Sequence, residues 1–152
     1  MKVLLQRVTR ASVRIDGAIV GAIDHGILVL LGVEKPDGVG DADYLADKTA
    51  DLRIFPDEQG RMNRSVLESG GAVLVVSQFT LASSTRRGRR PSFDSAAPPE
   101  VAEPLCRRFQ ERLAERGVRV ASGVFRASME VELVNDGPVT ILLDPPPGRG
   151  LS

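Results

Sequence analysis

Four consecutive residues at the end of an apolar run carry groups that could take part in chemistry: Ser77, Gln78, Phe79 and Thr80 follow residues 72–76. Their hydroxyls and amide are weak acids and bases, so they cannot drive strong proton transfer near neutral pH. They can donate hydrogen bonds to a developing oxyanion, as can backbone N–H groups where a strand ends. A Ser/Thr-rich strand end that hydrogen-bonds its own turn has the same composition, so both interpretations stay open.

A second segment, residues 135–140, interrupts a β-rich stretch with Gly137 and Pro138 before Val139 and Thr140. Asn-Asp-Gly-Pro is a common turn sequence, and proline is permitted at the first residue of a strand. A cis Gly137–Pro138 bond would reorient the two carbonyl groups and expose both as acceptors. Composition does not predict this isomer, because only about 5–6% of X-Pro bonds in folded proteins are cis.

The third feature is a basic loop with no acidic residue inside it, formed by Arg86, Arg87, Arg89 and Arg90 around a central glycine. Arginines in this density favour an anion-binding loop that contacts backbone phosphates without regard to base sequence. The alternative is a solvated loop paired with the acidic helix expected at 41–51. No aromatic ladder accompanies the arginines, which argues against base stacking as in single-strand binders.

Several other chemistries lack the residues they need. With one histidine and one cysteine, the chain cannot assemble a zinc site of Cys or His ligands, and no internal disulfide can form. His25 lies in a turn-like sequence, Asp-His-Gly, and is interpreted as a solvated turn residue rather than part of a catalytic triad. Phosphate-binding and dinucleotide-binding glycine patterns are absent, so we expect no metal and no cofactor.

The elements that must position these residues are mostly strands. A chain of 152 residues predicts one domain, and 42% hydrophobic residues are enough for an ordinary core. Apolar runs, alternation and the Asp16-Gly17 turn predict strands at 3–8, 11–15, 19–23, 27–33, 72–76, two within 118–134, and 139–143. One helix is expected to begin at an Asp41 cap. A second opens at Pro98-Pro99-Glu100, repeats apolar residues every four positions (Val101, Leu105, Phe109, Leu113) and ends at Gly117.

This order of elements predicts an α/β fold with layered β-sheets, helices packed on one face and a second β layer on the other. Residues 1–144 would form the domain, and residues 145–152 a flexible tail rich in proline and glycine. Two helices cannot cover this many apolar strands, so a homodimer is expected. No apolar run approaches the roughly 20 residues of a membrane span. A single cysteine and no signal peptide favour a cytoplasmic protein.

Taken together, these segments resemble the D-aminoacyl-tRNA deacylases from Met1 to about Asp144. The resemblance rests on motifs that occur in one order along the chain: 5–8 with 11–13, 30–33, 52–55, 77–81, 88–93 and 135–140. It implies hydrolysis of the ester joining a D-amino acid to tRNA, and also of glycyl-tRNA, including tRNA-Ala mischarged with glycine. It further implies a metal-free homodimer with active sites at the subunit interface.

The resemblance also assigns roles to residues. Gly137 and cis-Pro138, followed by Val139 and Thr140, would enter the partner's cavity, meet the α-amino group and reject L-amino acids. Residues 77–80 would surround the ester carbonyl and the terminal ribose, while Phe125 and Met129 would form a wall. Arg126 and Ser128 depart from the family pattern, which has glycine and aspartate there, and this bears on substrate preference or tRNA docking.

Because residues 77–80 include no strong base, we expect attack by water assisted by the substrate's own ribose hydroxyl. Thr80 as a covalent nucleophile is the rival mechanism. Two further classes stay open: a non-catalytic dimeric module that binds tRNA or other RNA through the arginine loop, and a purely structural dimer in which Gly137–Pro138 is only a turn.

Overall fold

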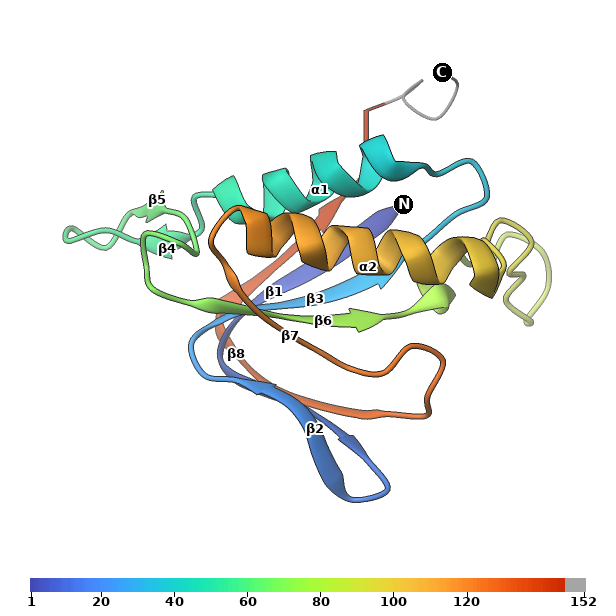
Figure 1. Ribbon diagram of the computed structural model, residues 1–152, viewed down its shortest axis with the longest axis horizontal. Coiled ribbons are helices and arrows are strands. Elements are labelled where there is room, and N and C mark those ends of the chain that lie inside the picture. Colours follow the sequence, from blue (N-terminus) through green and yellow to red (C-terminus); the bar gives the residue numbers. More distant parts are fainter. Residues whose placement is uncertain (147–152) are drawn as a thin grey trace.

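The computed structural model describes residues 1–146, so all but the first two residues of the expected tail at 145–152 lie outside the described part. Two helices lie against one side of a strongly curved sheet (Figure 1). The elements are β1 (Lys2–Ile15), β2 (Ala18–Ile23), β3 (Gly26–Gly32), α1 (Val39–Asp51), β4 (Phe55–Pro56), β5 (Met62–Arg64), β6 (Ala72–Ser77), the 3₁₀ helix η1 (Phe79–Ala82), α2 (Pro99–Glu115), β7 (Arg119–Ser122) and β8 (Glu130–Leu143).

The sheet has the strand order β2-β1-β3-β6-β7, and β8 pairs with the other edge of β1. The first half of β1 pairs with β3 and its second half with β2, while β8 follows its other edge along nearly the whole strand. Strand β2 in turn contacts β6 and β7. The sheet therefore folds over on itself into a barrel-like form, and β2 lies on the side away from the helices (Figure 1).

Two cores fill the space on either side of β3 and β6. Ile27, Val29 and Leu31 pack towards the helices, whereas Leu28 and Leu74 face the interior of the barrel. This alternation follows from the two-residue period of a strand and explains why both strands are apolar throughout. The layered α/β fold with helices on one face is thereby confirmed, and the second β layer is the same sheet returning.

Two predicted strand boundaries were wrong. The strands expected at 3–8 and 11–15 are one continuous strand, β1, with irregular register near its middle. The break expected at Gly137–Pro138 does not end a strand either, because β8 runs across it. The residue opposite Gln6 is Thr140 and the residue opposite Val8 is Asn135, so the residues between them bulge out of the ladder.

The helices also differ in detail from the sequence expectations. Gly38, not Asp41, is the N-cap of α1; the Asp41 carboxylate lies inside the first turn and accepts a hydrogen bond from the Gly38 N–H at 2.9 Å. In α2, Val101 faces outward. The buried face consists of Ala102, Leu105, Cys106, Phe109 and Leu113. Neither helix of the described chain has the length and apolar character that crossing a bilayer would require.

An ion-pair network joins the two helices. Arg108 contacts Asp43 at 2.6 Å, Arg112 contacts Asp47 at 2.8 Å, and Arg116 contacts Asp47 at 3.0 Å. Arg116 also pairs with Asp51. Hydrogen bonding to Arg112 is the main cause that lowers the pKa of Asp47. Three of the acidic residues of α1, Asp43, Asp47 and Asp51, are thus paired within the helical layer, and the expected alternative that the acidic helix pairs with the arginine loop was wrong.

Candidate active site

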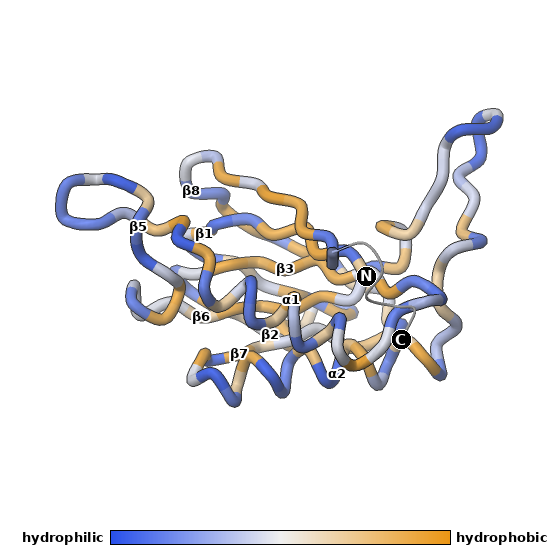
Figure 2. Tube along the Cα trace, turned by 90° about the horizontal axis from the view of Figure 1, so that it is seen from above, coloured by the Kyte–Doolittle hydropathy of each residue, from blue (hydrophilic) through white to orange (hydrophobic). Residues whose placement is uncertain are grey.

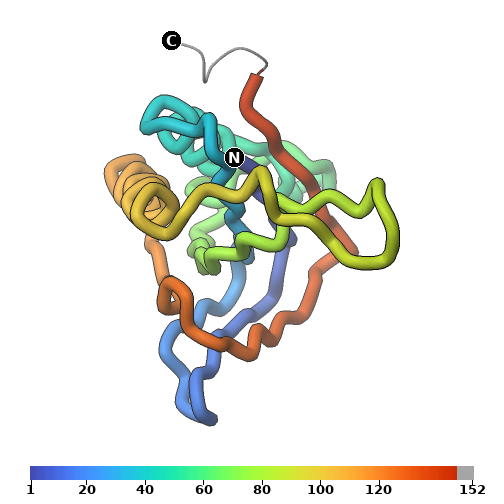
Figure 3. Tube along the Cα trace, turned by 90° about the vertical axis from the view of Figure 1, so that its right-hand side faces the viewer, coloured from blue at the N-terminus to red at the C-terminus, as the bar shows by residue number. Residues whose placement is uncertain are grey.

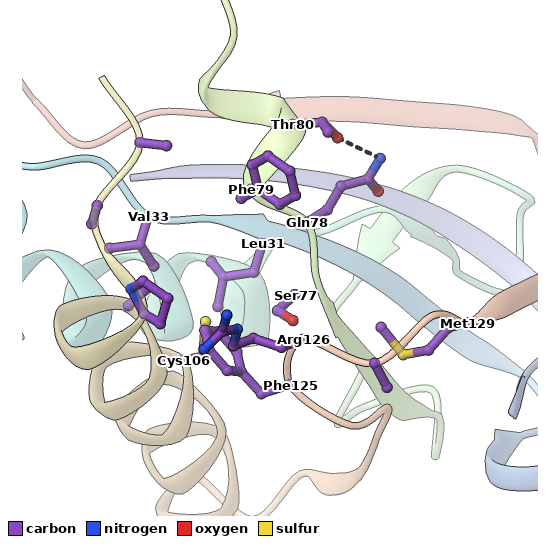
Figure 4. Close-up of a pocket in the computed structure, with 15 residues that line it drawn as sticks. Leu31, Val33, Ser77, Gln78, Phe79, Thr80, Cys106, Phe125, Arg126 and Met129 are labelled. Atoms are coloured by element: carbon purple, nitrogen blue, oxygen red, sulfur yellow. Dashed lines mark hydrogen bonds between the residues drawn. The ribbon is translucent and has the colours of Figure 1, made fainter. Parts of the chain in front are cut away.

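A cavity of about 450 Å³ opens where β3 and β6 end, beside the N-terminal half of α2. All four residues of the first polar segment line it: Ser77, Gln78, Phe79 and Thr80. Figure 4 shows them opposite a wall that includes Phe125 and Met129, as the resemblance implies for those two residues. Segments far apart in the sequence therefore meet at one site, which is called the ester cavity below after the ester that the resemblance implies there.

The polar segment is positioned by the end of strand β6. The Gln78 N–H donates to the Leu31 carbonyl at 2.8 Å and extends the parallel pairing of β3 and β6 by one residue. The chain then turns into η1, whose Leu81 N–H donates to the Gln78 carbonyl at 3.2 Å. The start of a helix leaves its first N–H groups without internal acceptors. Within residues 1–146, the N–H groups of Phe79 and Thr80 have no hydrogen-bond acceptor.

Close packing against Gly32 fixes the position of this turn relative to the end of β3. A Cβ at position 32 would lie 2.8 Å from the Leu81 Cβ and 3.1 Å from the Gln78 carbonyl oxygen. Real Cβ atoms essentially never approach a neighbour more closely than 3.0 Å. Only glycine lets η1 settle this close to the end of β3, so Gly32 sets the position of the polar segment.

The ester cavity contains groups that orient and polarise but no strong base. Among the described residues, its lining includes no histidine, aspartate or glutamate, and Arg126 is the one charged residue in it. The Gln78 amide donates to the Thr80 hydroxyl oxygen at 3.1 Å (dashed line in Figure 4). Cys106 also lines the cavity, but burial raises the pKa of its thiol to about 12, so it is a neutral thiol at physiological pH.

Metal ligands are not grouped anywhere in the described chain: residues 1–146 hold no cluster of three His, Cys, Asp or Glu side chains. His25 lies at the other end of the sheet, where its Nε2 is 3.1 Å from the Ser69 hydroxyl. That hydroxyl donates its proton to the Val66 carbonyl at 2.9 Å. The Ser69–His25 pair therefore lacks the arrangement of an activated nucleophile, and neither residue lines the ester cavity.

The segment Gly137–Pro138 lies apart from the ester cavity of its own chain. The bond between the two residues is cis, both are exposed, and neither is among the residues that line the cavity. Asn135 fixes the conformation of this segment, because its side chain accepts from the Val139 N–H at 2.7 Å and donates to the Thr140 hydroxyl at 3.2 Å. The protruding residues are thus held in one position.

Arg7 is a second support for this segment, and the sequence patterns predicted no role for it. Its guanidinium donates to the Asp136 carbonyl at 2.9 Å and to the Ile54 carbonyl at 2.6 Å. The side chain is 11% exposed. The sequence signal for this role was its place within the strand expected at 3–8, because a buried arginine is almost always paired.

The arginine loop is a narrow projection rather than an irregular coil (Figures 2 and 3). Ser84 and Ser92 exchange two backbone hydrogen bonds of 2.8 Å, and Gly88 turns the tip with a φ of +64°. Its four arginines, Arg86, Arg87, Arg89 and Arg90, are all exposed, and none has a hydrogen-bond or ion-pair partner within the described part of the chain.

An aromatic contact connects this loop to the ester cavity. The ring of Phe93 at the base of the loop lies edge-on to the ring of Phe79, with the centroids 5.2 Å apart. Phe79 is 60% exposed although it lines the cavity. The basic projection and the cavity therefore belong to one continuous surface.

Comparisons with known proteins found similar sequences and structures. The family model described as D-Tyr-tRNA(Tyr) deacylase matches residues 4–144. A D-aminoacyl-tRNA deacylase of Symbiobacterium thermophilum is 60% identical over 95% of both chains, and one of Anaeromyxobacter dehalogenans is 61% identical over 95% of this chain and 97% of that relative.

Two solved structures extend the comparison. One, named c-Myc DNA Unwinding Element Binding Protein, has a TM-score of 0.90 at 41% identity and covers 96% of this chain and 99% of its own. The other, described as a probable eukaryotic D-amino acid tRNA deacylase, has a TM-score of 0.80 over 93% and 97% of the two chains; at 18% identity it supports the fold alone. On the strength of the family model and the curated relatives, the chain belongs to the D-aminoacyl-tRNA deacylase family.

Proposed function

We propose that the protein hydrolyses the ester bond of D-aminoacyl-tRNA and releases the free D-amino acid and tRNA. The observation that carries this proposal is the ester cavity, in which the whole Ser77–Thr80 segment faces a wall containing Phe125 and Met129. The curated relatives that are 60% and 61% identical carry the name of this activity. Glycyl-tRNA, including tRNA-Ala mischarged with glycine, is proposed as a second substrate.

The chemistry follows from what the cavity offers. An ester is activated towards water when its developing oxyanion is held by preorganised donors. The N–H groups of Phe79 and Thr80, which have no acceptor within the described residues, are suited to that role. With no side-chain base among the described residues of the lining, the proton of the attacking water passes to the ribose hydroxyl beside the ester and then to the departing ribose oxygen.

Thr80 is not a covalent nucleophile in this proposal. A threonine hydroxyl needs a neighbouring base to become nucleophilic. Its oxygen accepts a hydrogen bond from the Gln78 amide, which is an orienting contact and does not remove the hydroxyl proton.

Selection against L-amino acids is assigned to the protruding segment Gly137–Pro138, acting in the cavity of a partner subunit. The segment is exposed, does not line its own cavity and is held by Arg7 and Asn135. Backbone oxygens placed at the α-ammonium group leave no space for an L side chain, and Val139 and Thr140 continue the same surface. Glycine, without a side chain, passes this filter.

A homodimer is part of the proposal, because the filter acts across subunits. Strand β8 carries three apolar side chains that are each at least 37% exposed: Val131, Val134 and Leu142. Exposed apolar side chains gathered on one element are typical of protein–protein contacts. Light scattering on the purified protein should give twice the mass of one chain.

The arginine loop is proposed to contact the tRNA backbone. Its four arginines, which lack partners in the described chain and lie next to the ester cavity, give a sequence-independent attraction for phosphates. A cytoplasmic location is part of the proposal, because its substrate, aminoacyl-tRNA, is present where translation occurs.

The decisive experiment compares D-tyrosyl-tRNA with L-tyrosyl-tRNA at equal concentration in the presence of EDTA. The proposal expects release of the D-amino acid only. Thr80→Ala should keep activity within about tenfold of wild type, whereas loss of a covalent nucleophile costs on the order of 10⁶-fold in kcat. Ser83→Ala, an exposed hydroxyl just beyond η1, is the matched control. Equal hydrolysis of both enantiomers would refute the proposed selection against L-amino acids. Absence of hydrolysis would refute the proposed enzymatic activity.

The second candidate function is a non-catalytic nucleic-acid-binding module. The arginine loop favours it, and so does the solved relative that is 41% identical, whose name refers to binding of a DNA element. Binding of both aminoacyl-tRNAs without turnover, with affinity falling steeply as salt rises, would select this function over hydrolysis.

A further inference from the structure

Arg126 gives the ester cavity a positive charge that the proposed hydrolysis does not use. It is the one charged residue among the described residues that line the cavity, and its neighbours there include the apolar Leu31, Val33 and Phe125 (Figure 4). No hydrogen bond or ion pair engages its guanidinium within residues 1–146. A cation in a largely apolar concavity attracts anions more strongly than the same charge on an open surface.

The acidic side chain of an adjoining hollow does not neutralise this charge. Glu103 lines that hollow, which shares Ser77, Cys106 and Phe125 with the ester cavity. It pairs with Arg107 at 3.9 Å. The ester cavity therefore carries a net positive charge.

The backbone holds Arg126 in a conformation that glycine would adopt more readily. The Ala127 N–H donates to the Val124 carbonyl at 3.2 Å, and Arg126 has a φ of +68°. This is the pattern of a type II turn, in which the third residue requires a positive φ. A residue held in such a conformation is a reason to look for a function.

The turn has a geometric result as well. In an extended strand, successive side chains point to opposite faces. Here the consecutive residues Phe125, Arg126 and Ala127 all line the same cavity. The turn thus directs the arginine to the space in which the substrate is proposed to lie.

We propose that Arg126 is a specificity-determining residue that binds an anionic oxygen group of the substrate in the ester cavity. The α-ammonium group of an aminoacyl ester would be repelled by Arg126, so the arginine serves another part of the molecule. Two parts carry the required chemistry: a side-chain carboxylate, as in D-aspartyl-tRNA, and a phosphate near the 3′ end of the tRNA. The inference rests on the proposed deacylase function.

The test compares D-aspartyl- with D-asparaginyl-tRNA, which have side chains of nearly the same shape and differ in charge. Arg126→Gly removes the charge and suits the φ of +68°, so the variant should fold at least as well as wild type. Arg126→Lys keeps the charge. Arg61→Gln removes an exposed arginine in the β4–β5 loop, far from Arg126 in the sequence, and is the control for net charge.

A carboxylate partner predicts that wild type prefers the aspartyl ester by about fivefold in kcat/KM, as an exposed ion pair allows. Arg126→Gly should abolish that preference and Arg126→Lys should keep most of it. A phosphate partner predicts that Arg126→Gly lowers kcat/KM about fivefold for both esters, with the loss disappearing near 0.5 M salt at a Debye length of about 4 Å.

Identical kinetics of Arg126→Gly and Arg61→Gln on both esters at low salt would overturn the inference. This result is distinguishable from failure of the proposed function, because the wild-type protein and Arg61→Gln would then still release D-amino acids. Absence of hydrolysis by wild type refutes the function itself.

Discussion

Replacing Gly32 by alanine tests whether the packing at the end of β3 positions the Ser77–Thr80 segment, to which catalysis is assigned in the proposed function. The added methyl would lie 2.8 Å from the Leu81 Cβ, about 0.6 Å short of the 3.4 Å at which ordinary contact begins. It would also press on the Gln78 carbonyl oxygen at 3.1 Å. Both neighbours are in or next to η1, so relief of the contact must move η1 away from β3.

The size of the effect follows from this displacement. Overpacking of this kind typically costs about 1–3 kcal/mol of the free energy of unfolding. The N–H groups of Phe79 and Thr80 move with η1, and a misplacement approaching 1 Å can cost on the order of 100-fold in rate. For a shift of about 0.6 Å, we expect kcat to fall by about ten- to a hundredfold on D-tyrosyl-tRNA.

The assay measures kcat at a temperature where urea unfolding confirms that Gly32→Ala is folded. Gly40→Ala is the matched control, because position 40 lies exposed in α1 with no atom within 4 Å of an added Cβ. Alanine in a helix is favoured over glycine by up to about 1 kcal/mol, so this control should keep full activity. A folded Gly32→Ala enzyme with wild-type kcat would refute the positioning role, whatever its stability.

Three further predictions concern other supports of the fold and the site. Arg7→Ala leaves the Asp136 carbonyl without its donor, so urea unfolding should show a loss of about 2–3 kcal/mol and L-tyrosyl-tRNA should become a substrate; Arg10→Ala, an exposed neighbour, should change neither. The pKa of Asp47 is lowered in the folded state, chiefly by Arg112, so its contribution to stability is complete above its ordinary value of 3.8 and is lost as pH falls through the lowered pKa. The free energy of unfolding of wild type should therefore fall more steeply below about pH 4 than that of Asp47→Asn, and equal slopes would contradict the assignment. Cys106 should resist iodoacetamide at pH 8, since burial raises its pKa to about 12; rapid labelling detected by mass spectrometry would show that the cavity wall opens.

The sequence predicted those parts of the fold that depend on local patterns. Residues 27–33 and 72–76 are apolar on both faces, and the structure buries both faces of these strands. Asp16 and Gly17 both have positive φ in the expected hairpin turn. Periodicity and turn chemistry act over a few residues, so such features can be read without knowledge of distant contacts.

Features that depend on distant contacts were not predictable in this way. The strand β8 continues past Gly137–Pro138 because β1 supplies a partner on both sides of the bulge. The α2 wall of the ester cavity is formed by small and apolar residues, Ala102 and Cys106 among them, whose composition is that of any core helix. The importance of Arg7 appears only once residues 54 and 136 are known to lie beside it.

The pairing between α1 and α2 has a consequence for how this molecule would approach a polyanion. The formal net charge is zero, so bulk measures such as the isoelectric point give no sign of affinity for nucleic acid. Yet Asp43, Asp47 and Asp51 of α1 are matched by arginines of α2, while the four arginines of the projecting loop have no such match in the described chain. The protein therefore has an electric dipole without a net charge. The field of a polyanion would orient the arginine loop towards the polyanion before any contact forms.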